Sequence, residues 1–493
     1  MNTYDGSNLK GSSVLLIGAT GFIGRYLVSY MKGKGCSVIA GVRDVTSARQ
    51  QLGQDVTLID INGDTDLIVA TLEKVETVIN MAGRQLAGVR WTKKRKAEFS
   101  ESRIGLNKKI VKCISLCEKP PTTFLTASAV GVYGDSGRKE ISEQGPDGTG
   151  YLADMCRQWE DAANEGIKSN VRVISLRLGI VLNREGGMLN QLTLPFEMGV
   201  GSYIGDGKQI VPWIHLKDVL RMIDYVISNR EISGPVNCTA PNPITAKFFA
   251  ETLKRNTAAK LLLPLPKIVL KILFGEGAGV LTNSQNAIPK KALDTGFHFT
   301  YEDINSALQS EFDDHSVDVQ KVNLQTDELA PHSEKTITSA QYRLKTQATL
   351  NVSTEKAFKF FHSPANLGLC TPPWLRFSVL ESSPEMGKDS MYVYQIKLGP
   401  IPLKWRTRII EWTPDDGFID LQEKGPYKLW VHRHQMKQIT SGWTEMEDIV
   451  HYSLPFGPIG KLAHNLIIKK VLKRIFSYRN EIIKLRFGEQ LVG

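Results

Sequence analysis

The first half of the chain alternates short apolar runs with longer amphipathic stretches. The apolar runs predict buried strands at residues 14–17, 37–42, 56–61, 77–81, 122–127 and 171–176, and helical patterns such as 104–117 separate them. Strands that alternate with helices in this way predict a parallel, doubly wound sheet. Ligands of such sheets bind in the crevice at the carboxyl ends of the strands. The pattern therefore predicts an α/β fold with its site at that edge.

The second half has a different pattern. A polar stretch at 311–335, in which acids outnumber lysines, predicts a solvated linker. A strand at 342–352, a helix at 354–362, five or six strands and a helix at about 459–486 follow. One face of the strand at 428–439 carries Trp430, His432, His434 and Met436, and the final helix has an apolar stripe of Leu462, Leu466, Val471, Ile475, Tyr478 and Ile482. This order predicts an α+β helix-grip domain, in which the sheet wraps the final helix around an apolar cavity.

A glycine-rich turn joins the first predicted strand to the first predicted helix, with the sequence Gly18-Ala-Thr-Gly-Phe-Ile-Gly24. Its glycines allow a tight turn and let backbone amides approach a pyrophosphate at the helix N-terminus, where the helix dipole favours negative charge. An ordinary loop is the alternative, but the strand before the turn and the helix after it argue against that. The expected cofactor-binding residues here are Gly18, Thr20, Gly21, Phe22, Ile23 and Gly24.

The ends of the next strands indicate which dinucleotide binds. Arg43 follows the second strand, where an acidic residue would favour NAD and an arginine can hold the 2′-phosphate of NADP. We therefore expect NADP(H) to be favoured over NAD(H), although Asp44 keeps NAD open and Arg43 has the alternative of a plain surface residue. Further cofactor contacts are expected from the ends of the third and fourth strands, at Asp60, Ile61, Asn80, Ala82 and Gly83.

Several motifs of the first 310 residues occur in the order typical of one family. They include Leu58-Ile-Asp-Ile61, Asn80-Met-Ala-Gly83, Thr126-Ala-Ser-Ala-Val-Gly-Val-Tyr-Gly134, Val211-Pro-Trp-Ile-His215 and Ile288-Pro-Lys-Lys-Ala-Leu293. Together they resemble the extended short-chain dehydrogenase/reductase family, and more narrowly its atypical epimerase branch with a C-terminal extension of unknown function. The resemblance implies a nucleotide-binding part at about 12–180 and a small substrate part at about 181–310.

The resemblance also implies hydride transfer, in which a serine and a tyrosine hold the substrate oxygen and a lysine four residues later assists the tyrosine. This dyad is absent, because Leu152 and Cys156 occupy the corresponding positions, and Tyr30 with Lys34 lies far from the expected site. The remaining catalytic candidates are Ser128, Tyr133 and Tyr151, with capping or cleft lining as the alternatives. Cys156 has no identifiable base that would make it a nucleophile.

The substrate part offers two tentative contacts, Arg90 and Trp91, in a loop after the fourth strand. An exposed charge with no ligand is the alternative for Arg90. His215 and Asp218 open a predicted helix and have a mainly structural role in the wider family. The apolar, proline-interrupted stretch 261–274 is expected to pack on the core rather than touch a membrane.

Composition narrows the class of protein. A hydrophobic content of 42% and a charged content of 23% are typical of a soluble globular chain. The net charge of +10 favours anionic ligands, and nucleic-acid binding is not expected. Six cysteines lack C-x-x-C spacing, the first residues lack a signal-peptide pattern, and no apolar run is long enough to span a membrane. The expected location is cytoplasmic.

Residues 336–493 resemble the polyketide cyclase/dehydrase and lipid-transfer superfamily, the START-like ligand binders. The resemblance rests on Thr371-Pro-Pro-Trp374, Leu398-Gly-Pro-Ile-Pro-Leu-Lys-Trp405, Gly425-Pro-Tyr427 and Leu454-Pro-Phe-Gly-Pro-Ile-Gly460. It implies an apolar ligand in the cavity of this domain. His432 and His434 lack an evident third ligand, so no metal is assigned. The cationic face of the final helix, from Lys461 through Arg479, is expected to be solvated, with peripheral membrane contact as the less favoured alternative.

The sequence thus predicts an NADP(H)-dependent oxidoreductase or epimerase-like enzyme that acts on a small carbonyl or hydroxyl substrate and is fused to a module for an apolar ligand. The missing dyad leaves a non-catalytic nucleotide sensor as one alternative. A lipid carrier with a degenerate reductase domain is the other.

Overall fold

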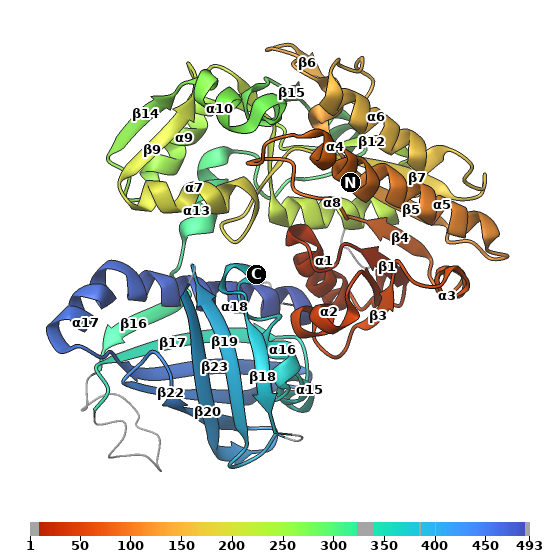
Figure 1. Ribbon diagram of the computed structural model, residues 1–493. Coiled ribbons are helices and arrows are strands. Elements are labelled where there is room, and N and C mark those ends of the chain that lie inside the picture. The colour runs from red at the N-terminus through yellow and green to blue at the C-terminus, as the bar shows by residue number, and fades with distance from the viewer. Residues whose placement is uncertain (1–8, 323–338, 384–385, 400, 489–493) are drawn as a thin grey trace. The chain divides into compact units, whose positions relative to one another are not determined.

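The chain forms two compact units. The computed structural model describes residues 9–322, 339–383, 386–399 and 401–488. Unit 1 comprises residues 1–45 and 57–312, and unit 2 comprises residues 46–56 and 313–493. Figure 1 colours the chain by residue number, with unit 1 mainly red to green and unit 2 mainly cyan to blue.

Unit 1 is built on a seven-stranded parallel sheet with the strand order β12-β7-β5-β4-β1-β2-β3. Its inner strands β1, β4 and β5 are buried because both faces are covered, whereas two of the four residues of the edge strand β3 are exposed. Every predicted strand of the first half is present. The reversal of strand order beside β1 is the switch point at which such sheets bind ligands. The strands are β1 (Ser13–Ile17), β2 (Ser37–Val42), β3 (Thr57–Asp60), β4 (Thr77–Asn80), β5 (Thr123–Ala129), β7 (Arg172–Leu178) and β12 (Gly234–Cys238).

Helices connect these strands, and several begin at a side-chain cap. Asp64 accepts a hydrogen bond from Asp66 N before α3, and Thr92 accepts one from Arg95 N before α4. The helix predicted at 104–117 is longer at its start, because a π-helical turn at Glu101–Gly105 joins α4 to α5. The helices are α1 (Phe22–Gly33), α3 (Thr65–Leu72), α4 (Lys93–Ser100), α5 (Leu106–Leu116), α6 (Tyr151–Asn164) and α8 (Leu216–Ser228). The helix α2 (Val45–Leu52) lies between β2 and β3 in the sequence, but all of its residues except Val45 belong to unit 2.

Small paired strands and helices complete unit 1. The elements are β6 (Glu140–Ile141), β8 (Ile180–Leu182), α7 (Gly187–Glu197), β9 (Val200–Ile204), β10 (Ile210–Val211), β11 (Trp213–His215), β13 (Ile244–Thr245), α9 (Ala246–Arg255), β14 (Leu261–Leu265), α10 (Lys267–Phe274), α11 (Gly279–Thr282), β15 (Asn286–Ala287), α12 (Lys290–Asp294) and α13 (Ile304–Phe312). Several of them, including β8, α7, α9 and α13, contribute to a separate core that contains Trp213, Phe249 and Leu253.

The apolar stretch 261–274 departs from its prediction. It forms β14, which pairs with β9, and the helix α10. Leu261, Ile268 and Ile272 are each more than half exposed, and among the residues of α10 only Leu270 is buried. The expectation that this stretch packs on the core was therefore wrong for most of its side chains, because a two-stranded edge and a short helix can bury only one face.

Unit 2 contains an eight-stranded antiparallel sheet with the order β16-β17-β23-β22-β21-β20-β19-β18. The long helix α18 (Lys469–Phe487) runs along this sheet (Figure 1). Leu472 and Phe476 of α18 share a core with Leu344 and Val450 of the sheet. The other elements are β16 (Val317–Lys321), β17 (Tyr342–Leu350), α15 (Thr354–Phe361), α16 (Pro364–Leu367), β18 (Ser378–Ser382), β19 (Met391–Leu398), β20 (Ile401–Thr413), β21 (Gly417–Lys424), β22 (Leu429–Thr440), β23 (Trp443–Ser453) and α17 (Gly457–Ala463).

Part of the predicted linker belongs to this sheet. Val317–Lys321 forms β16 and pairs antiparallel with β17, and Asp314 accepts a hydrogen bond from Ser477 Oγ of α18 at 2.9 Å. Val317 and Val319 are buried in the alternation expected of a half-buried strand. The sequence signal was hidden because acidic residues flank this short strand. Residues 323–338 of the predicted linker lie outside the described residues.

The final helical region consists of three segments instead of one regular helix. α17 is followed by a π-helical segment, His464–Ile468, and then by α18. Tyr478 and Ile482 are buried as the apolar stripe predicts, whereas Leu462 and Leu466 are 60% and 61% exposed. The N-terminal part of the apolar stripe therefore lies in solvent, and only its later part joins the core. Within the described residues, no helix combines the length and hydropathy needed to cross a membrane.

Candidate functional site

The glycine turn after β1 brings backbone segments too close for side chains. Gly18 has φ +84°, and a Cβ there would lie 2.7 Å from the backbone nitrogen of Ala82. A Cβ on Gly24 would lie 2.1 Å from the carbonyl oxygen of Gly18. Gly21 N closes the turn by donating to Gly18 O at 2.9 Å. Glycine is therefore required at positions 18 and 24 by local geometry, and the turn leaves the N-terminus of α1 open beside the cleft.

A cleft of about 670 Å³ borders this turn and the carboxyl ends of β1 to β4. Seven of the predicted cofactor residues line it: Gly18, Thr20, Gly21, Arg43, Ile61, Ala82 and Gly83. Phe22, Ile23 and Gly24 form the first turn of α1 and do not line the cleft. The structure thus brings together residues from four strand ends that are distant in the sequence.

Asp60 and Asn80 are also outside the cleft lining. The Asp60 carboxylate accepts a hydrogen bond from Asn62 N at 2.8 Å, which shapes the turn after β3. Asn80 is fully buried, accepts from Ala82 N at 3.1 Å and donates to Asn107 Oδ1 at 2.8 Å. Asn80 therefore holds the backbone of the loop that borders the cleft, and this geometry favours a supporting role for it.

The sequence predictions did not include several polar residues at the cleft. Arg84, Lys109 and Glu101 line it, and Glu101 begins the π-helical turn. Arg103 lies behind Gly83, is 6% exposed, and donates from Nη2 to Arg84 O at 2.7 Å. Burial lowers the pKa of the Arg103 guanidinium to about 10. Glu101 and Arg103 lie in the π-helical turn, which has no clear sequence signal, so periodicity could not have placed these two side chains.

Ser128 and Tyr133, two of the catalytic candidates, belong to a buried hydrogen-bond network. Ser128 Oγ donates to Glu160 Oε1 at 2.6 Å, and Tyr133 OH donates to Asn237 Oδ1 at 2.8 Å. Arg177 joins the two halves by donating to both Glu160 oxygens at 2.9 and 2.8 Å and to Tyr133 OH at 2.8 Å. Ser128 and Tyr133 are 1% and 2% exposed. This arrangement favours a supporting role for both hydroxyls.

Electrostatics explain how the network remains charged while buried. Burial alone would lower the pKa of Arg177, but the hydrogen bonds and charge of Glu160 raise it above its usual value. Burial raises the pKa of the Tyr133 phenol, although Arg177 partly opposes the shift. Tyr133 is therefore neutral at physiological pH and unsuited to act as a base there. Arg177 and Glu160 were missed as network members because they lie on separate elements, β7 and α6.

Tyr151 is the catalytic candidate that is partly exposed. It begins α6, donates its hydroxyl to Lys96 O at 3.0 Å, and packs edge-on against Trp91. Lys96 Nζ lies 4.4 Å from the ring centroid of Tyr151.

Cys156, which lies further along α6, is fully buried, and burial raises its pKa to about 12. This shift favours the protonated thiol over a thiolate nucleophile at this position. All six cysteines are free and buried.

The tentative substrate residues Arg90 and Trp91 bind the helix α10 region. Arg90 Nη1 donates to Ile272 O at 2.6 Å, and Trp91 N donates to Phe274 O at 3.3 Å. Trp91 Nε1 donates to Leu86 O at 3.0 Å. These contacts fix the loop after β4 to α10, so both residues have a structural function whether or not they touch a substrate.

His215 occupies the structural position that was expected for it. Its Nδ1 accepts from Lys217 N at 3.1 Å as the N-cap of α8, and its Nε2 lies 2.8 Å from Glu311 Oε1. Burial alone would raise the pKa of Glu311, but the hydrogen bond and charge of His215 lower it below its usual value. Glu311 was assigned to the solvated linker, and that assignment was wrong because tertiary packing pairs this carboxylate with a buried imidazole.

Unit 2 contains a second cavity, of about 330 Å³, between the sheet and α18. Its wall is mostly apolar, with Trp405, Trp430 and Phe476 among its aromatic residues. Its few charged or titratable side chains include Asp420, His432, His434 and Arg479. The predicted face of β22 therefore does line a cavity, as expected for Trp430, His432 and His434. The sequence did not reveal Asp420, which comes from the neighbouring strand β21.

A doubly wound parallel sheet whose first glycine turn borders a cleft at the switch point is characteristic of dinucleotide-binding enzymes of the reductase and epimerase class. The model of the NAD dependent epimerase/dehydratase family matches residues 14–238, and that of a domain of unknown function, DUF1731, matches residues 265–311. The chain belongs to the NAD dependent epimerase/dehydratase family.

Similar proteins agree with this assignment. The epimerase family protein YfhF of Bacillus subtilis is 33% identical over 297 residues, which cover 60% of this chain and 96% of that protein. The chloroplastic SDR39U1 homolog of Arabidopsis thaliana is 35% identical over 301 residues, which cover 60% and 86%. The crystal structure of human epimerase family protein SDR39U1 (isoform 2) with NADPH has 28% identity and a TM-score of 0.55, and covers 61% of this chain and 99% of that one.

Proposed function

We propose that unit 1 binds NADP(H) and acts as an atypical oxidoreductase or epimerase-like enzyme on a small carbonyl or hydroxyl substrate. The observation that carries the proposal is the cleft at the glycine turn, with Arg43 at the end of β2 among its lining residues. Human SDR39U1, which is similar to this chain, was crystallised with NADPH. The neighbours that were crystallised with NAD are below 25% identical and have TM-scores below 0.5, so they carry no argument about this chain.

The residues present suit a dinucleotide. A Cβ at Gly18 or Gly24 would fill space that the turn needs in order to present its amides, so this chain retains the geometry that a pyrophosphate requires. When bound, NADPH would supply a hydride. In the proposal, Gly18 and Gly21 hold the pyrophosphate, Arg43 holds the 2′-phosphate, and Lys109 and Arg84 add positive charge to the same cleft.

We propose that the hydroxyl of the partly exposed Tyr151 contacts the substrate oxygen. In this proposal the other two catalytic candidates, Ser128 and Tyr133, have a positioning role through their hydrogen bonds with Glu160 and Arg177. Arg90 and Trp91 hold the neighbouring loop. The test is NADPH oxidation by the full chain with a panel of carbonyl compounds, in wild type and Tyr151→Phe. Tight NADPH binding without oxidation of any compound would favour the alternative, a nucleotide sensor.

Arg43→Ala is expected to weaken NADPH binding about ten- to a hundredfold, because a hydrogen-bonded charge pair contributes about 1.5–3 kcal/mol. NADH lacks the 2′-phosphate, so its affinity should change little. Isothermal titration of both nucleotides with wild type and variant measures the two ratios. Equal losses for NADPH and NADH would show that Arg43 does not contact the phosphate.

For unit 2 we propose a helix-grip, START-like module that holds an apolar small molecule. The apolar cavity between the antiparallel sheet and α18 supports this proposal, since pockets of this kind bury most of a small ligand. Native mass spectrometry of the full chain would detect a copurifying ligand. If the ligand occupies the cavity, the Trp430→Arg variant should lose it. Circular dichroism should show that this variant keeps its fold.

A specific surface supports a second candidate function, a lipid carrier that docks on membranes. Phe456, Ile459 and Ile467 are 80%, 73% and 60% exposed, and Ile467 also lines the cavity. Lys461 and Lys470 are exposed on the same segment. An apolar surface with cations at the rim of an apolar cavity suits the interface of an anionic bilayer.

The double variant Lys461→Gln/Lys470→Gln is expected to weaken binding to vesicles of phosphatidylcholine and phosphatidylserine about thirtyfold, at about 1 kcal/mol per lysine. Vesicle flotation at low salt measures the bound fraction. Lys424→Gln/Lys437→Gln is the matched control, because both lysines are exposed in the same unit on the sheet. An equal loss in both double variants, or no flotation of the wild type, would remove this candidate.

A further inference from the structure

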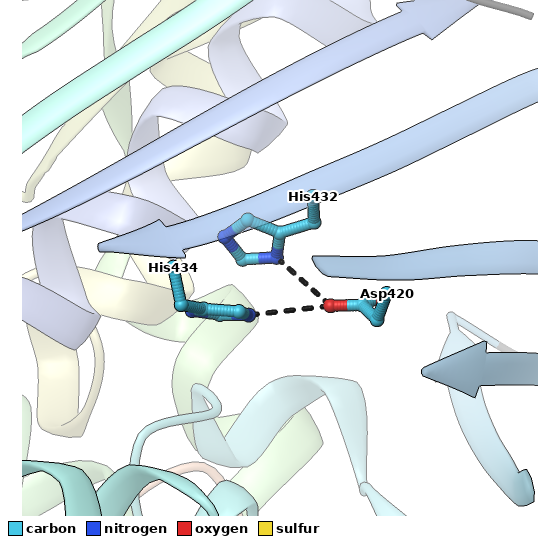
Figure 2. A group of neighbouring side chains, drawn as sticks. All are labelled: Asp420, His432 and His434. Atoms are coloured by element: carbon cyan, nitrogen blue, oxygen red, sulfur yellow. Dashed lines mark hydrogen bonds and ion pairs between the residues drawn. The ribbon is translucent and has the colours of Figure 1, made fainter. Parts of the chain in front are cut away.

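We propose that Asp420, His432 and His434 form a binding site for one divalent transition metal ion in the cavity of unit 2. The three side chains come from adjacent strands, β21 and β22. Figure 2 shows the imidazoles of His432 and His434, which are two residues apart on β22, both directed at the Asp420 carboxylate. The inference is independent of the proposed function, because it requires neither a nucleotide in unit 1 nor an apolar ligand in unit 2.

The strand pairing explains why the three groups meet. Asp420 is the direct cross-strand partner of His432 in the antiparallel pair, and His434 lies two residues further along β22 on the same face. Cross-strand neighbours and their diagonal partners lie within reach of each other's side chains. His432 and His434 are nine-tenths buried, and the ring centroids are 3.7 Å apart. The site is therefore held by two strands in the middle of the sheet.

The distances suit coordination of one ion. Asp420 Oδ2 lies 3.2 Å from His434 Nε2 and 3.7 Å from His432 Nδ1, and the ligand atoms of the three residues all lie within 4.8 Å of one another. Ligand atoms that are each about 2.0–2.2 Å from a tetrahedral zinc ion are separated by about 3.3–3.6 Å. Small rotations of the side chains would therefore place one ion between these atoms.

The opposite ring nitrogens are already held. His432 Nε2 lies 3.1 Å, and His434 Nδ1 2.7 Å, from the same Asp448 oxygen. Arg479 Nε donates to the other Asp448 oxygen at 2.8 Å, and Thr407 Oγ1 donates to Asp420 Oδ1 at 3.0 Å. Metal-binding histidines usually donate their second N–H to a carboxylate, which fixes the ring and its tautomer. Both histidines have this kind of partner in Asp448, and Asp420 is supported by the Thr407 hydroxyl.

Charge and donor type indicate the class of ion. With neutral imidazoles, the two carboxylates and one guanidinium give the buried cluster a net charge of about −1, which favours a cation. Two imidazoles with one carboxylate suit Zn²⁺ or Fe²⁺ better than Ca²⁺ or Mg²⁺, which prefer oxygen ligands. Three protein ligands leave a coordination position open, and all three residues line the cavity. A ligand in the cavity would therefore be able to reach the ion.

The test is a Co²⁺ titration of the chelator-treated full chain, followed by visible absorption and by native mass spectrometry. We expect one Co²⁺ per chain with the d–d absorption of a nitrogen- and oxygen-coordinated ion, and displacement of Co²⁺ by Zn²⁺. Asp420→Asn and His434→Gln should lose this absorption. Asp448→Asn should retain the stoichiometry but weaken binding about ten- to a hundredfold, as expected for a supporting partner.

His464→Gln is the matched control, because His464 is a buried histidine of unit 2 that pairs with Tyr452 outside the cluster. It should bind Co²⁺ like the wild type, and circular dichroism should show that every variant is folded. Binding with the absorption unchanged in Asp420→Asn would place the ion elsewhere. Absence of binding by the folded wild type would show that the cluster is only a network of ion pairs.

Discussion

Replacing Gly24 with alanine is expected to weaken NADPH binding strongly and to destabilise unit 1. The added Cβ would lie 2.1 Å from Gly18 O and 2.8 Å from Ala19 Cα, which are backbone atoms that can move only with the turn. Overpacking of this kind costs about 1–3 kcal/mol. A displaced turn also loses hydrogen bonds to phosphate oxygens, at about 1.5–3 kcal/mol each, so the dissociation constant should rise at least about a hundredfold.

Isothermal titration with NADPH and thermal unfolding of the full chain measure the two effects. Gly279→Ala is the control, because its φ is −54° and an added Cβ would come no closer than 3.6 Å to any neighbour. This control should bind NADPH normally and unfold at the temperature of the wild type. Normal NADPH binding by a folded Gly24→Ala variant would refute the proposed role of the glycine turn.

Arg177→Met should lower the free energy of unfolding of unit 1 by about 3–5 kcal/mol, because it leaves the buried Glu160 carboxylate without its partner. The side chains of Arg177 and Glu160 are 7% and 13% exposed, so solvent can replace little of the lost interaction. Urea denaturation with hydrogen exchange of β5 and β7 peptides separates the response of unit 1 from that of unit 2.

The double variant Arg177→Met/Glu160→Leu should recover much of this loss, since removal of both charges leaves no unpaired ion. Arg157→Met is the surface control: the Arg157 pair with Asp147 is exposed, and no measurable change is expected. A small effect of Arg177→Met alone would show that the network does not hold this part of the sheet together.

Hydrophobic periodicity was sufficient to predict the parallel, doubly wound sheet of unit 1 and the run of strands followed by a long final helix in unit 2. Strands β1, β2, β4, β5 and β7 occur close to their predicted ranges, since a buried parallel strand needs a continuous apolar run. Periodicity could not show that Val317–Lys321 joins the second sheet, because a five-residue strand among acidic residues carries little pattern. It also could not show that α10 and the start of the final helix leave apolar side chains in solvent.

The candidate sites depend more on tertiary structure than the secondary-structure elements do. Local sequence determined the glycine turn, because the positive φ of Gly18 and the close approach of Gly24 to Gly18 O are set within the turn itself. It also determined the cavity-facing side of β22, because a strand alternates its faces.

Only the folded chain brings Asp420 beside His432, or Arg177 between Glu160 and Tyr133. Those neighbours follow from strand register and helix packing across long sequence separations. Folding also buries charged residues that have no distinguishing pattern in the sequence, and their charges must then be paired.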